Sequence, residues 1–108
     1  MAALVTDIET PRIGARLRRI WLDGEPWKTT SAAVVKAVGV ATGDVVEPDA
    51  LSLSLQSNEA DAARERALQL LGYRERSRFE LRAKLAEDGY PPPVLSAIVG
   101  AFEHTGLV

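Results

Sequence analysis

The spacing of apolar residues predicts that the second half of the chain is helical. Five of them form a stripe near the C-terminus: Val94, Leu95, Ile98, Val99 and Phe102. Positions three and four apart lie on one face of a helix, so this stripe predicts a helix with one buried face. The prolines at 91–93 favour its start, and Gly106 favours its end.

Two further helices are expected before this one. For the first, the apolar positions at helical spacing are Ala60, Ala63, Ala67, Leu70 and Leu71. They predict a helix over 59–71, capped by Ser57 or Asn58 and ended by Gly72. The serine-rich residues 50–58 lie between two periodic regions, and we expect them to form a separable linker.

The next helix, residues 78–87, has the most specific start signal of the chain. Ser77 is followed three residues later by Glu80, which is the spacing of a capping box. In this motif the serine hydroxyl and the glutamate carboxylate each accept from the other residue's backbone N–H. Gly89 is expected to end the helix, with Tyr90 packing back on its end. The side chains expected to point inward are Phe79, Leu81 and Leu85.

The first half of the chain predicts β-structure. Residues 13–30 alternate loosely between apolar and polar positions around Asp23-Gly24, a dipeptide that favours the tight turn of a β-hairpin. Pro26 marks the return strand as an edge. Residues 1–12 show no period, and we expect them to be a frayed lead-in.

A short helix and a less regular stretch follow the hairpin. Ser31 and Gly39 are the expected cap and stop of a helix over 32–38. Residues 40–46 are expected to return as a brief extended piece. Within residues 47–55 a proline favours a helix start, whereas the alternating leucines that follow suit a strand as well as a helix.

These elements predict an α+β fold that is mostly α: an N-terminal β-hairpin unit followed by three helices. We expect two domains, residues 1–55 and 56–108. The 108 residues are 46% hydrophobic, which is enough for a packed core. No apolar run approaches the roughly 18 residues that span a bilayer. The N-terminus carries acidic residues where a signal peptide needs basic ones.

Charge is distributed in blocks, although the net charge is only −2. Residues 11–36 hold six basic residues against two acidic ones, and residues 64–84 hold seven against three. Such blocks favour an anionic partner, with a merely solvated surface as the alternative. We define the C-terminal basic cluster as Arg74, Arg76, Arg78, Arg82 and Lys84. The N-terminal basic strand is Arg16, Arg18 and Arg19, and both groups are candidate partner-binding residues.

The residues offer little catalytic chemistry. Cysteine is absent, which excludes disulfides and thiol catalysis and fits a reducing cytoplasm. His104, the only histidine, is expected at a helix end, and no nucleophile–base pair or metal-ligand spacing accompanies it. We therefore expect no enzyme activity, no metal and no cofactor. Trp21 and Trp27 could stack bases, but tryptophans in a small hairpin more often pack on the adjacent helix.

Residues 64–108 resemble the three-helix repeat of the RecX family of bacterial regulatory proteins. The resemblance rests on an S-R-x-E-L-x-x-K-L core and on G-Y and G-L-V stops at the family's spacings. Residues 21–25 and 39–44 are similar to the hairpin and turn of the family's N-terminal extension. The matching residues of the repeat are Ala67, Leu68, Leu70, Leu71, Arg76, Ser77, Arg78, Glu80, Leu81, Lys84, Leu85, Gly89, Tyr90, Val94, Gly106, Leu107 and Val108.

The resemblance implies a cytoplasmic regulator that binds the RecA–DNA filament and suppresses recombinase and ATPase activity. Such a protein would modulate homologous recombination, DNA repair and the SOS response. The implied partners are the RecA recombinase and, as a further candidate, DNA, without a membrane or a small-molecule substrate. The alternative is a direct DNA-binding module, in which the helices form a helix-turn-helix and the hairpin a wing.

Family members generally stack three such repeats, and this sequence shows one. The apolar Leu107-Val108 pair follows a helix stop, and we expect it to pack against a following repeat. The chain is therefore expected to be a fragment that self-associates or has low stability by itself.

Overall fold

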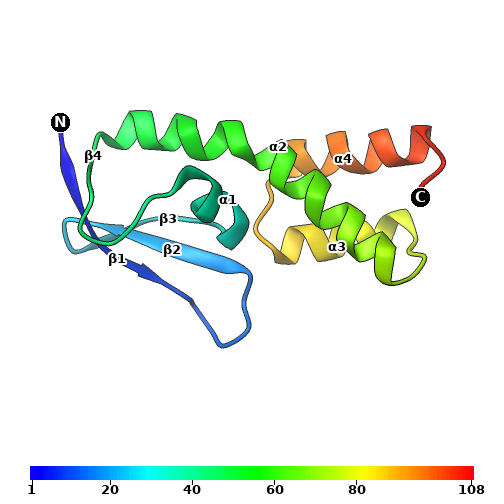
Figure 1. The fold of residues 1–108 in the computed structure, drawn as a ribbon, viewed down its shortest axis with the longest axis horizontal. Helices are drawn as coiled ribbons and strands as arrows, with labels where there is room; N and C mark the ends of the chain where they lie inside the picture. The colour runs from blue at the N-terminus through cyan, green and yellow to red at the C-terminus, as the bar shows by residue number, and fades with distance from the viewer. The chain divides into compact units, whose positions relative to one another are not determined.

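The computed structural model describes all 108 residues and contains four strands and four helices (Figure 1). Their bounds are β1 (Ala3–Glu9), β2 (Leu17–Leu22), β3 (Glu25–Ser31), α1 (Ala32–Val38), β4 (Val45–Val46), α2 (Pro48–Tyr73), α3 (Arg78–Glu87) and α4 (Pro92–His104). The predicted α+β fold, mostly helical with the strands first, is confirmed. The chain forms two compact units, Met1–Asn58 and Glu59–Val108. The predicted division at residues 55 and 56 stays a prediction, and that boundary, like the one between the units, falls inside α2.

The four strands form one antiparallel sheet in the order β3-β2-β1-β4. The prediction that residues 1–12 are a frayed lead-in is therefore wrong, because β1 is an inner strand. Val5 lies opposite Leu22 of β2, and Leu4 lies opposite Val45 of β4. Pairing with both neighbours, which come from later parts of the chain, holds β1 in place.

The predicted hairpin is confirmed, with β2 and β3 as its arms. Asp23 and Gly24 both have positive φ, 50° and 80°, as a type I′ turn requires. The first arm is shorter than predicted, because the strand begins at Leu17 rather than near residue 13. The pairing register shifts between Ile20 and Trp21, close to Pro26, which has no N–H for the ladder.

The core of the first unit lies between the sheet and α1. Val5, Ile20 and Val34 are completely buried. Helix α1 begins and ends as predicted: the Ser31 Oγ accepts from the Val34 N–H at 3.1 Å, and Gly39 has a φ of 80°. These two local signals fix the helix that covers the sheet.

Helix α2 is continuous, so the predicted break at residues 57–58 is wrong. Ser57 and Asn58 do not cap a helix; both side chains donate back to the carbonyl of Ser54, at 3.0 and 2.8 Å. Such bonds satisfy the polar side chains inside a helix without ending it. The helix also continues past Gly72 to Tyr73, and the supposed linker lies within it. The alternating leucines of 47–55 are helical.

The core of the second unit is aliphatic and lies between its helices. The predicted inward stripe of α4 is largely confirmed, since all but the half-buried Val94 are buried. Leu81 and Leu85 of α3 are completely buried, and Tyr90 packs at the end of that helix with 4% exposure. Phe79, however, is 71% exposed, so the prediction that it points inward is wrong.

A largely buried ion pair joins α2 to the end of α3. The Arg66 Nε donates to the Asp88 Oδ2 at 2.8 Å, with the two side chains only 17% and 8% exposed. Substituting one member of a buried ion pair is costly, because the other charge then stays buried without its partner.

Replacing one member of this pair tests its contribution. Asp88→Asn is expected to lower the free energy of unfolding by about 3 kcal/mol, because Arg66 then keeps a poorly solvated charge. Asp61→Asn is the matched control, since Asp61 pairs with Arg64 at 3.4 Å on an exposed surface. That control is expected to cost less than about 0.5 kcal/mol in urea denaturation. Equal, small effects of both substitutions would contradict the stabilising role of the Arg66–Asp88 ion pair.

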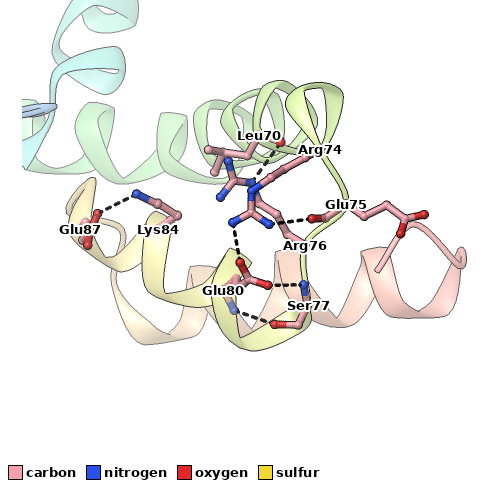
Figure 2. A network of polar contacts seen from close by, with 8 residues as sticks. All are labelled: Leu70, Arg74, Glu75, Arg76, Ser77, Glu80, Lys84 and Glu87. Atoms are coloured by element: carbon pink, nitrogen blue, oxygen red, sulfur yellow. Dashed lines mark hydrogen bonds and ion pairs between the residues drawn. The ribbon is translucent and has the colours of Figure 1, made fainter.

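The start of α3 is held by the predicted capping box, which is confirmed (Figure 2). The Glu80 N–H donates to the Ser77 Oγ at 3.2 Å, and the Glu80 carboxylate accepts from the Ser77 N–H at 3.3 Å. The same carboxylate accepts from the Arg74 Nη2 at 2.7 Å. The Arg74 hydrogen bond and the Ser77 N–H hold the pKa of the Glu80 carboxyl below its ordinary value of 4.5.

This lowered pKa predicts how stability depends on pH. Because the folded chain favours ionised Glu80, the contribution is present above about pH 4.5 and is lost as the pH falls through the lower folded-state pKa. Glu80→Gln is therefore expected to melt below the wild type at pH 7, and the difference should shrink in acid. Glu75→Gln, at an exposed neighbouring carboxylate, is the control in the same thermal melts. A gap for Glu80→Gln that stays constant from pH 7 to pH 3 would rule out this linkage.

Candidate functional site

The C-terminal basic cluster lies around the α2–α3 turn and along α3, and one of its members stabilises the end of α2. The Arg76 Nε donates to the carbonyl of Leu70 at 3.1 Å, and Arg76 is half-buried (Figure 2). Leu70 belongs to the last turn of α2, where carbonyls have no partner within the helix. Arg76 therefore has a structural role at this helix end.

Arg74 and Lys84 are also engaged by neighbours within the chain. Arg74 is bonded to Glu80 and donates from Nη1 to the carbonyl of Glu75 at 3.0 Å. The Lys84 ammonium lies 3.8 Å from the Glu87 carboxylate (Figure 2). Both side chains are about half exposed, so these contacts fix their orientation more than they neutralise them.

Arg78 and Arg82 are the least engaged members of the cluster. They lie four residues apart on one face of α3 and make only long polar contacts across to α4. The Arg78 Nη1 is 3.4 Å from the Glu103 carboxylate, and the Arg82 Nη1 is 3.3 Å from the Ser96 hydroxyl. Both side chains are exposed, which leaves donors free for an anionic partner.

The N-terminal basic strand belongs to the first unit and is largely used within it. Arg18 donates from Nη1 to two nearby backbone carbonyls, at 2.7 and 3.1 Å. The Glu9 Oε1 accepts from both the Arg19 Nη1, at 3.0 Å, and the Trp21 Nε1, at 2.8 Å. Arg16 is exposed just before β2. The Arg19 contact joins β2 to β1, whereas the Arg18 contacts are local. The role predicted for these residues in partner binding stays a prediction.

The exposed ring of Phe79 is a feature of α3 that the sequence reading missed. The guanidinium carbon of Arg78 lies over this ring, 4.9 Å from its centroid. Helical geometry contained the signal: two residues along a helix turn through about 200°, so Phe79 cannot share the buried face of Leu81. The combination of an exposed ring and two exposed, weakly engaged arginines makes the outer surface of α3 the candidate partner-binding site.

The structure provides no group of three or more metal-binding side chains. His104 is exposed in the last turn of α4. No helix combines the length and the apolar character that crossing a membrane requires.

Comparisons with known proteins agree on one family. Residues 63–100 match the model of the first three-helix domain of RecX, a stretch that contains the whole C-terminal basic cluster. A solved structure described as the crystal structure of regulatory protein RecX shares the fold, with a TM-score of 0.51 and 21% sequence identity. The similarity covers 98% of this chain but only 52% of the other, so the chain spans about half the length of that protein. No curated protein gives a significant sequence match. This match identifies residues 63–100 as similar to the first three-helix domain of the RecX family.

Proposed function

We propose that this protein is a RecX-type regulator that binds the RecA–DNA filament and lowers its recombinase and ATPase activity. The observation that carries the proposal is the position of Arg78 and Arg82. Both lie within the stretch that matches the first RecX domain, and both keep exposed guanidinium groups. A filament on DNA presents phosphates, which are suited to such donors. The activity would modulate recombination and repair in the cytoplasm.

The proposed mechanism is binding without chemistry. The arginines supply electrostatic attraction to the filament. The bound protein then covers part of the filament surface and hinders the ATP hydrolysis cycle of the recombinase. Inhibition of this kind needs neither a cofactor nor a small-molecule substrate. Since the chain spans about half of the RecX structure that it resembles, inhibition by this chain alone is part of the proposal.

A helix-turn-helix that reads duplex DNA is a less suitable function for these helices. A recognition helix carries several side chains that reach base edges. The outward positions of α4 include Ala97, Gly100 and Ala101, which have no such groups. Duplex DNA is therefore retained only as a control ligand in the experiment below.

Charge removal on α3 tests the proposal. The double variant Arg78→Gln/Arg82→Gln is expected to bind a RecA filament on single-stranded DNA roughly tenfold more weakly at about 0.1 M salt, with a shallower salt dependence, because two phosphate contacts are lost. The inhibition of ATP hydrolysis should weaken in parallel. The variant should melt like the wild type, because neither arginine closes a helix end.

The control variant Arg12→Gln/Arg64→Gln removes the same charge elsewhere. Both residues are exposed and lie outside the two basic groups. If the control weakens filament binding as much as the α3 variant does, net charge rather than the α3 surface determines affinity. If the wild type neither binds the filament nor slows its ATPase, the proposed function is wrong.

A further inference from the structure

The outer face of α3 carries an aromatic side chain without a packing partner in the core of its unit. Phe79 is 71% exposed, although burying such a ring is among the larger hydrophobic gains available to a small core. Ala83 and Ala86 follow at helical spacing on the same face and are also exposed. Both of these neighbours are small side chains.

The ring is oriented by the basic residue beside it. The Arg78 guanidinium lies over the ring, 4.9 Å from its centroid, and a cation at this distance is attracted by the π-electrons. An aromatic ring has two faces, and this contact uses one. Because Phe79 is 71% exposed, ring surface outside this contact is open to a flat group from a partner.

The charges around the ring define which flat group fits. Arg78 and Arg82 are separated by four residues, or about 6 Å along the helix axis, on the side of α3 that faces α4. Arg82 has a hydroxyl, not a carboxylate, as its contact across that side. The surface therefore combines a free ring face with adjacent positive charge, which is complementary to a base attached to phosphates. An acidic protein segment would match the charges, but its carboxylates alone would leave the ring without a stacking partner.

We propose that the outer face of α3 binds single-stranded nucleic acid, with one base stacked on the free face of Phe79 and neighbouring phosphates bonded to Arg78 and Arg82. This inference rests on the proposed function, because it assigns the exposed strand of the filament as the ligand of the same surface. Stacking is tolerant of sequence, because every base has a π-face. Binding should accordingly depend little on base composition.

The test uses the full chain and a labelled single-stranded oligothymidylate of roughly 20 nucleotides, titrated across a salt series. Phe79→Leu keeps an apolar side chain but removes the ring, and we expect it to weaken binding roughly tenfold with an unchanged salt slope. Phe79→Trp should bind at least as tightly as the wild type. Arg78→Gln and Arg82→Gln should each lower the salt slope by about 0.7, the value for one phosphate contact on a single strand.

Leu68→Ala is the matched control, because Leu68 is an apolar side chain of α2 that is 51% exposed. It should leave the affinity unchanged. Equal affinities of Phe79→Leu and the wild type would overturn the inference, and so would equal losses in Phe79→Leu and Leu68→Ala. A loss confined to the protein–DNA filament, with binding to naked oligonucleotide intact, would assign the ring to a protein contact and also overturn it.

The same measurements separate this inference from the proposed function. If the wild type slows filament ATP hydrolysis while Phe79→Leu binds the oligonucleotide normally, the stacking site is wrong and the regulatory function stands. If the ring dependence on the oligonucleotide is observed but the wild type has no effect on the filament, the stacking site stands and the regulatory function is wrong.

Discussion

The turn between α2 and α3 must satisfy the free backbone groups of two helix ends within a few residues, and the candidate site depends on how it does so. The last carbonyls of α2 and the first N–H groups of α3 have no partners within their helices. Arg76 donates to the Leu70 carbonyl, and the Ser77–Glu80 capping box satisfies donors at the other end. Arg74 then holds the Glu80 carboxylate. Some of the charged residues that the sequence suggests as a binding surface therefore stabilise the two helix ends instead.

Sequence reasoning succeeded where a structure is determined by neighbouring residues. The Ser77–Glu80 box and the Asp23-Gly24 turn need only a few adjacent residues, and both formed as predicted. It failed for β1, whose strand geometry is stabilised by β2 and β4 from later parts of the chain. It also failed at Ser57, because a serine that caps a helix and one that bonds back within a helix are the same letter in the sequence.

The candidate site shows a related limit. The sequence identified all five cations of the C-terminal basic cluster, because charge can be read directly from composition. It could not identify the partner of each cation, since Glu103 and Ser96 lie in a different helix from Arg78 and Arg82. The error at Phe79 is of another kind: its spacing of two residues from Leu81 puts it about 200° around α3, outside the buried face, although the side chain is hydrophobic.

Helix α3 carries its stabilising contacts on one side and the residues of the proposed binding surface on another. Leu81 and Leu85 form the buried side, and the contacts of Glu80 with Arg74 hold the helix start. Phe79 and Arg82 lie on surfaces that none of these contacts need. An exposed phenylalanine contributes little to the stability of the unit, and its apolar surface remains in water until a partner covers it. In the proposed binding, only a partner would cover this apolar surface, so substitutions on the outer side of α3 are expected to change ligand contacts without changing the fold.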